Sequence, residues 1–325
     1  MHHTKLEKKI TAYIEKKGLI NDGARLIIGL SGGPDSVFLM HFLATIREAK
    51  KLSLIAAHLD HGWRAESAND AQFCKELACK YSIPFIGKTI ADLDLSVKFN
   101  ASKEEIGRKA RRTFFESVAK EHNASAIALA HHADDQMETF FIRMMRGASL
   151  TGLVGMKAQD GMYIRPLLEI KKAVILAYLH ENKINYLIDA SNQSDSYLRN
   201  RIRNTAIPGL QSVDSRFDQN FSTTHANLVQ TEEFLQELAH QTLRTICDES
   251  GSLAVDQLLA LHPAICHRVV INWLVAHKVP FTPSQGLLDE IIRFLEKPGN
   301  GHHIFYDKWT IHKNGNFASI IFANV

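Results

Sequence analysis

Short apolar runs alternate with amphipathic segments through the first two hundred residues. Four runs have the composition of strands: ARLIIGL (24–30), SLIAAHL (53–59), PFIGKTI (84–90) and SAIALA (125–130). The segments between them, such as SVFLMHFLATIREAK (36–50), have the length of helices. The nearly continuous apolar stretches Leu26–Leu30, Leu54–Leu59 and Ala126–Ala130 are typical of strands buried on both sides. We therefore predict an α/β fold, a doubly wound parallel sheet with helices on both faces.

The pattern changes near residue 215, where helical segments follow one another without strands. Residues 224–246 and 261–278 both have apolar positions at helical spacing. Near the end, Asn314-Gly315 separates the apolar runs 303–312 and 316–325, which is a strong signal for a β-hairpin. We predict a catalytic domain at 1–215, a connector at 192–216, and a smaller, mostly helical domain at 216–325 that ends in a β-hairpin.

Composition excludes several classes of protein. The chain has 325 residues and no apolar run near the ~20 that cross a bilayer, and its start lacks the apolar centre of a signal peptide. We expect a cytoplasmic protein without a membrane partner. The four cysteines form no CxxC pair, so we expect reduced structural thiols and no zinc or iron–sulfur site.

The net charge of +3 is too small to diagnose nucleic-acid binding, but basic residues are clustered locally. One cluster lies within residues 103–112 and the other within residues 199–203. Arginines in such clusters contact RNA phosphates or a flipped-out base. Solvated helix faces explain either cluster taken alone equally well.

The segment Ser31-Gly32-Gly33-Pro34-Asp35-Ser36 follows the first predicted strand and precedes a predicted helix. Two glycines allow a tight turn in which backbone N–H groups and the helix N-terminus converge on an anion. The loop lacks the lysine of a Walker A motif, so it is not arranged for the γ-phosphate. Asp35 can instead hold the Mg²⁺ that accompanies a pyrophosphate. The alternative is a plain turn in which Asp35 or Ser36 caps the helix.

Further polar residues follow the second and fourth predicted strands, and strand ends of a parallel sheet meet at one edge. They are His58, Asp60, His61 and Arg64, then His131, His132, Asp134, Asp135 and Glu138. Helix capping by the carboxylates is one alternative, and a metal-dependent phosphohydrolase site is another. The same helix carries apolar residues at core spacing, Met137, Phe140, Phe141, Met144 and Met145.

Together these motifs resemble a known family. SGGPDS after a buried strand resembles the pyrophosphate loop of the N-type ATP pyrophosphatases. Five further stretches resemble the tRNA(Ile)-lysidine synthetase family in order: HLDHGWR (58–64), EEIGRKARRTFF (104–115), LAHHADDQMETFFIRMMRG (129–147), RPLL (165–168) and DASNQSDSYLRNRIRNTAIPGL (189–210). Arg112 replaces the more usual tyrosine and Trp63 a leucine. The chain resembles the short form, because longer members continue into another domain.

The resemblance implies ATP and Mg²⁺ as cofactors, and free L-lysine and a tRNA(Ile) with a CAU anticodon as partners, with a homodimer left open. It implies catalytic roles for Asp35, Asp135 and Arg111, with Asp135 the candidate base on its position. It implies nucleotide binding by Ser31, Gly32, Gly33, Pro34, Asp35, Ser36, His58 and Asp60, with Asp35 the metal ligand. It implies substrate binding by Arg64, Arg108, His131, His132, Asp134, Glu138, Arg143, Arg146, Arg201 and Arg203. A sulfur-inserting tRNA enzyme and a non-catalytic RNA-binding protein are the competing hypotheses.

Overall fold

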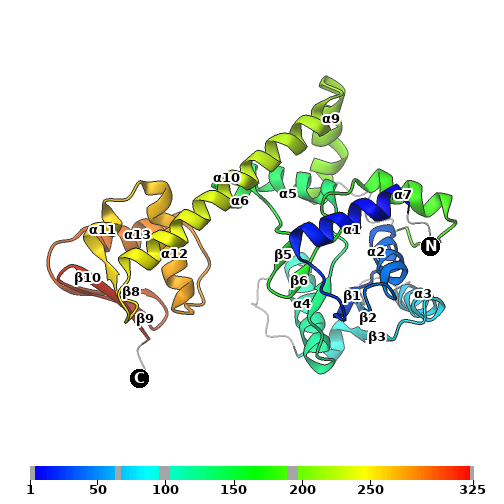
Figure 1. The fold of residues 1–325 in the computed structure, drawn as a ribbon, viewed down its shortest axis with the longest axis horizontal. Coiled ribbons are helices and arrows are strands. Elements are labelled where there is room, and N and C mark those ends of the chain that lie inside the picture. The colour runs from blue at the N-terminus through cyan, green and yellow to red at the C-terminus, as the bar shows by residue number, and fades with distance from the viewer. Residues whose placement is uncertain (1–3, 63–66, 95–102, 189–196, 323–325) are drawn as a thin grey trace. The chain divides into compact units, whose positions relative to one another are not determined.

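The computed structural model describes residues 4–62, 67–94, 103–188 and 197–322. The chain divides into two compact units, Met1–Phe221 and Ser222–Val325 (Figure 1). Each unit has its own sheet and its own hydrophobic core. The two units are therefore described separately.

The sheet of the first unit has six strands in the described residues, in the order β3-β2-β1-β4-β6-β5. The strands are β1 (Arg25–Gly29), β2 (Ser53–Asp60), β3 (Phe85–Thr89), β4 (Ala126–Ala128), β5 (Gln159–Asp160) and β6 (Tyr163–Ile164). All neighbours are parallel except β5, which pairs antiparallel with β6. The four predicted strands are confirmed, and the parallel sheet has β1 at its centre.

Alternate residues of each strand point to opposite sides of this sheet, so it has two apolar faces. Helices cover both of them. Leu26 and Ile28 pack with α1 (Lys5–Lys17), α2 (Pro34–Ile46), α3 (Ser67–Lys80) and α7 (Lys172–Glu181). Ile27 faces the other way, toward Phe114 and Val118 of α4 (Lys103–Glu121). The predicted doubly wound fold is confirmed.

A third group of helices lies beside the carboxyl end of β4. It contains α5 (Ala133–Met145), α6 (Leu150–Leu153), α8 (Leu198–Arg201), the π-helical turn η3 (Ile202–Ala206) and α9 (Ile207–Val213). Met137 of α5 packs against Ile202 and Ile207. Residues 198–213 are therefore helices of the first unit rather than a connector. The division between the units falls within the next helix, α10 (Phe217–Ile246).

The prediction that Met144 and Met145 are core residues is wrong, since they are 48% and 58% exposed. They lie in the last turn of α5, beyond the contacts that bury Met137. Phe140 and Phe141 are half-buried instead, in ring contacts with Phe221 at centroid distances of 5.2 and 6.0 Å.

The second unit packs helices against an antiparallel sheet of order β7-β10-β9-β8. Its elements are β7 (Leu253–Ala254), α11 (Val255–Leu259), α12 (Pro263–Ala276), α13 (Gln285–Glu296), β8 (Gly301–Tyr306), β9 (Trp309–Asn314) and β10 (Phe317–Phe322). The predicted hairpin is confirmed as β9–β10, which turns at Gly315 with φ +58°. The run 303–312 contains two strands rather than one, because the chain turns at Asp307 with φ +45°.

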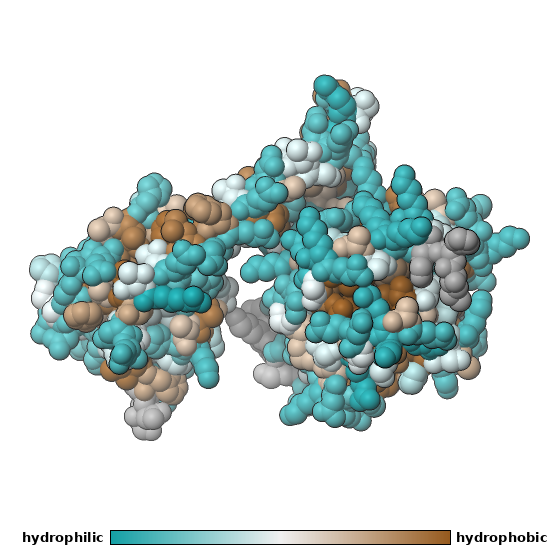
Figure 2. All heavy atoms as spheres, in the orientation of Figure 1, coloured by the Kyte–Doolittle hydropathy of each residue, from teal (hydrophilic) through white to brown (hydrophobic). Residues whose placement is uncertain are grey.

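Hydrophilic side chains cover most of each unit on the face seen in Figure 2, with apolar side chains scattered among them. Within the described ranges, no helix combines the length and apolar character needed to cross a bilayer. The four cysteines are free thiols. Cys74 and Cys266 are buried, whereas Cys79 is exposed.

Candidate functional site

The loop between β1 and α2 leaves the first turn of α2 without a side-chain cap. Gly33 is the N-cap residue and Pro34 follows it. Ser36 Oγ accepts a hydrogen bond from Ser31 N–H at 3.1 Å and donates to Gly33 O at 3.0 Å, which closes the turn. The alternative in which Asp35 or Ser36 caps the helix is therefore wrong. The N–H groups of the first turn and the positive end of the helix form a site for an anion.

Gly32 has a backbone conformation that the loop requires. Its φ of +82° lies in the left-handed region, and a Cβ there would lie 2.6 Å from Leu187 Cδ1 and 3.3 Å from Cys74 Sγ. Leu187 N–H also donates to Gly32 O at 2.9 Å. Only glycine combines this φ with so close an approach of a neighbouring segment.

Asp35 lies in the first turn of α2 and faces two cationic groups. Its Oδ2 is 3.3 Å from Lys172 Nζ and 3.6 Å from His132 Nε2. Burial raises the pKa of the carboxyl group, but the hydrogen bond and charge of His132 and the charge of Lys172 outweigh it and lower the pKa below its usual value. Oδ1 is buried and has no hydrogen-bond partner among the described residues. Asp35 is therefore an ionised carboxylate, and no described residue hydrogen-bonds to its Oδ1.

His132 is the N-cap residue of α5, and its ring is 2% exposed. Burial alone would lower its pKa, but carboxylates of Asp134, Asp35 and Asp135 within 3.6 Å raise the pKa to about 9. The N–H of Asp135 approaches Nδ1 at 3.4 Å, which requires an unprotonated nitrogen. Because that distance is long for a hydrogen bond and three carboxylates favour the cation, we assign the imidazolium.

Asp134 connects the N-termini of two helices. Its Oδ2 accepts a hydrogen bond from Lys172 N–H at 2.8 Å and lies 3.5 Å from His132 Nδ1. The neighbouring Ala133 N–H donates to Ile170 O at 2.9 Å. The structure thus places this predicted substrate ligand at the first N–H of α7, whereas the capping alternative concerned the first turn of its own helix, α5.

Glu138 is the most buried carboxylate of the site and is 1% exposed. It accepts hydrogen bonds from Arg199 Nε at 2.6 Å and from Arg203 Nε and Nη2 at 2.5 and 3.0 Å. Arg199 Nη2 also donates to Asp135 Oδ1 at 2.9 Å. The predicted acidic pair Asp135 and Glu138 is therefore brought together, and two guanidinium groups already neutralise it.

Two residues of this candidate site were not predicted individually from the sequence. Arg199 was noted only as part of a basic cluster, although it is four residues before Arg203, as expected for one helix face. No sequence pattern indicated a role for Lys172, because its partner Asp35 lies 137 positions away in the chain.

The polar residues that follow β2 and β4 differ in their roles. His58 Nδ1 is hydrogen-bonded to Leu30 O at 2.9 Å, and its buried Nε2 has no partner in the described part of the chain. Asp60 accepts from Gly62 N–H at 2.7 Å and closes a turn. Burial, with the charges of nearby arginines, lowers the pKa of His131 to about 4, so this ring is neutral.

The remaining predicted basic residues lie mostly at the surface. Among them, four have exposed side chains: Arg108, Arg111, Arg146 and Arg201. Arg143 instead donates to Gly152 O at 2.7 Å and Gly155 O at 3.1 Å, and so holds the segment after α5. After burial, the charge of Arg111 is the main cause that lowers the pKa of His61. Arg64 and Trp63 lie outside the described residues.

The site fits a magnesium–nucleotide complex better than a metal held by protein ligands alone. No group of three or more His, Cys, Asp or Glu within the described ranges is arranged to hold a metal ion. Mg²⁺ is commonly held by one or two carboxylates plus substrate phosphates, and Asp35 Oδ1 beside an uncapped helix N-terminus suits that arrangement.

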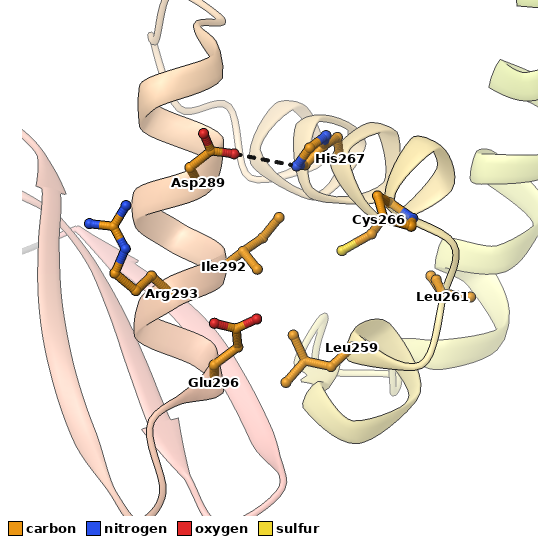
Figure 3. A pocket seen from close by; sticks show the side chains of 9 residues that line it. Leu259, Leu261, Cys266, His267, Asp289, Ile292, Arg293 and Glu296 are labelled. Carbon is orange, nitrogen blue, oxygen red and sulfur yellow. Dashed lines mark ion pairs between the residues drawn. The ribbon is translucent and has the colours of Figure 1, made fainter.

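The second unit contains a separate pocket of about 390 Å³ between α11, α12 and α13 (Figure 3). Leu259, Leu261 and Ile292 contribute apolar walls, and His267 and Asp289 form an ion pair of 3.6 Å at one side. Its charged residues have both signs. None of its lining residues is a buried carboxylate without a hydrogen-bond partner.

Comparison with known proteins identifies the family. Residues 2–210 match the model of the ATP-binding PP-loop domain. The chain belongs to the PP-loop domain family. The match contains the loop at 31–36 and the charged residues of α5, α7 and α8.

This PP-loop protein is similar to proteins named tRNA(Ile)-lysidine synthase. It is 34% identical to that of Bacillus subtilis, over 90% of this chain and 64% of the relative, and 36% identical to that of Clostridium perfringens, over 78% and 55%. The chain thus spans less than two thirds of the length of these relatives. A U34-tRNA thiolase from Methanococcus maripaludis has the same fold, with a TM-score of 0.57 at 18% identity over 69% of this chain and 77% of that one.

Proposed function

We propose that this PP-loop protein is an ATP-dependent ligase that joins free L-lysine to C2 of the wobble cytidine in a tRNA(Ile) with a CAU anticodon. The products are lysidine, AMP and pyrophosphate, and the modified anticodon reads AUA instead of AUG. The observation that carries the proposal is the uncapped, glycine-dependent loop beside Asp35, in a chain whose relatives are named tRNA(Ile)-lysidine synthase. Such a reaction belongs in the cytoplasm.

In the first step, the C2 oxygen of cytidine attacks the α-phosphorus of ATP and pyrophosphate leaves. The first-turn N–H groups of α2 can hold the phosphates, because no side chain occupies them. Mg²⁺ bound by Asp35 would neutralise charge on the leaving pyrophosphate. His58 Nε2, if Nδ1 donates to Leu30 O, is a buried acceptor suited to an amino group of a base.

In the second step, the ε-amine of lysine attacks C2 and AMP leaves. Free lysine carries two ammonium groups and one carboxylate, so its site needs groups of both signs. Asp135 and Glu138 supply carboxylates, and Arg199 and Arg203 supply cations for the lysine carboxylate. A base must also accept a proton from the amine, and Asp135 is our candidate by its position. Its hydrogen bond from Arg199 must lengthen before it acts as a base.

For the RNA, exposed arginines suit phosphate contacts. We assign this role to Arg108, Arg111, Arg146 and Arg201, whose side chains lie at the surface of the first unit. We assign catalysis and these phosphate contacts to residues 1–215 and additional tRNA binding to residues 216–325. A homodimer is compatible with both assignments.

The test is incorporation of radiolabelled lysine into a tRNA(Ile) transcript with a CAU anticodon, in the presence of ATP and Mg²⁺. We expect incorporation by the wild type, and at least a hundredfold less by Asp35→Asn, which keeps the shape of the side chain but removes its charge. Asp22→Asn is the control, because Asp22 is a surface carboxylate whose side chain is 74% exposed. If the wild type cleaves ATP with other tRNAs but transfers no lysine, the proposal of lysidine formation is refuted. If it binds RNA but cleaves no ATP, the proposal that it is a ligase is refuted.

A further inference from the structure

Lys172 is a cation in an unfavourable place. It is the first residue of α7, and Lys171 is its N-cap residue, with no acidic side chain in the first turn. The positive end of a helix dipole disfavours a cation there. The main chain of Lys172 is nevertheless fixed, because its N–H donates to Asp134 Oδ2 at 2.8 Å. Its side chain therefore starts from an anchored position beside the phosphate loop.

The Lys172 ammonium group lies beside one oxygen of the Asp35 carboxylate. Its Nζ is 3.3 Å from Oδ2, while Oδ1 of the same carboxylate is buried without a partner in the described residues. The lysine side chain is 33% exposed and has a flexible four-carbon stem, so Nζ can move away from Asp35 without a change in the backbone.

Charged groups of both signs surround Asp35 before any ligand binds. The anions are Asp35, Asp134, Asp135 and Glu138, and the groups facing them are Lys172, Arg199, Arg203 and the His132 ring. A divalent ion alone would be repelled by the positive charge of Lys172, whose Nζ lies 3.3 Å from Asp35 Oδ2. A nucleotide brings phosphate charge that compensates the ion and offers the ammonium group a new partner.

We propose that Lys172 is a positioning residue that prevents Asp35 from binding a divalent ion alone and transfers its ammonium group to the phosphates when metal and nucleotide arrive together. This inference rests on the proposed binding of ATP to the loop, but not on the identity of the amino acid or the RNA. It predicts opposite effects of one substitution on two binding constants. Loss of a merely structural contact would not tighten metal binding.

The experiment counts free Mn²⁺ by electron paramagnetic resonance, with the full chain and without tRNA or lysine. Mn²⁺ stands in for Mg²⁺, and the nucleotide is the α,β-methylene analogue of ATP, which resists cleavage between the α- and β-phosphates. The proteins are the wild type, Lys172→Gln, the charge-conserving Lys172→Arg, and the neighbouring control Lys171→Gln. Lys171 pairs with Asp218 at 2.5 Å and not with Asp35. Circular dichroism checks that each variant is folded.

Without nucleotide, we expect Lys172→Gln to bind Mn²⁺ about tenfold more tightly than the wild type, while Lys172→Arg and Lys171→Gln remain close to the wild type. With the analogue, we expect Lys172→Gln to bind the Mn²⁺–nucleotide complex about tenfold more weakly. Unchanged Mn²⁺ affinity in folded Lys172→Gln would overturn the inference and leave the proposed function standing. The expected pattern in a protein that transfers no lysine would refute lysidine formation alone.

Discussion

Gly32→Ala tests whether the loop conformation is set by local backbone strain or by the neighbouring segment. A side chain at φ +82° costs about 1–2 kcal/mol for the left-handed backbone. The new Cβ would also lie 2.6 Å from Leu187 Cδ1, an overpacking that costs typically 1–3 kcal/mol. Because the methyl group is at the end of a side chain and can rotate, we take the lower value. The expected loss is about 2–3 kcal/mol in the free energy of unfolding.

Gly23→Ala is the matched control, since Gly23 has φ +76° with nothing within 4 Å of its Cβ position. It should cost only the backbone strain of about 1–2 kcal/mol. A double-mutant cycle with Leu187→Ala isolates the contact, with an expected coupling energy of about 1 kcal/mol. The assay is unfolding in urea, monitored by pulsed hydrogen exchange. Peptides from Leu26–Leu43 report the unfolding of the first unit. If Gly32→Ala lowers the free energy of unfolding by the same amount in the wild type and in Leu187→Ala, the steric argument is refuted.

Three further predictions concern titratable side chains that are wholly or partly buried. Glu138→Gln should lower the stability of the first unit by about 1–3 kcal/mol, because it weakens charged hydrogen bonds at a 1% exposed site; an unchanged exchange rate in α5 peptides would contradict this. Burial lowers the His41 pKa, so the unfolded chain binds its proton first and the free energy of unfolding should fall as pH drops below about 6.5; His41→Gln should reduce that slope. Glu232→Ala should lower the free energy of unfolding of the second unit by about 3–5 kcal/mol, because it removes the carboxylate that neutralises the buried Arg268; tryptophan fluorescence in urea measures it, and a loss below 1 kcal/mol would show that water replaces the ion pair.

Much of the first unit follows from local patterns. Strands β1, β2 and β4 are buried on both faces, so their apolar composition is nearly continuous and visible in the sequence. Strands β5 and β6 have two residues each and carry no periodicity that a sequence can show. The turn at Asp307 also escaped prediction, because an aspartate at φ +45° replaces the glycine that marks most such turns.

The site was predicted where its residues follow a strand directly and missed where a long-range contact defines the role. Asp35 and His132 lie just past β1 and β4, whose carboxyl ends share one edge of the sheet. The role of Lys172 depends on α7 lying beside α2, which no local pattern reveals. For the same reason, the sequence showed Glu138 as an available carboxylate, although two arginines of a distant helical segment neutralise it.

His132 is a cation that cannot diffuse away. A bound metal ion holds carboxylates together only while its concentration in solution exceeds its dissociation constant, and a chelator removes it. The imidazolium of His132 is covalently attached and 2% exposed, so its local concentration beside Asp35, Asp134 and Asp135 is fixed by the fold. The three acidic groups should therefore keep their spacing through dialysis against a chelator, because no metal ion is needed to hold them together.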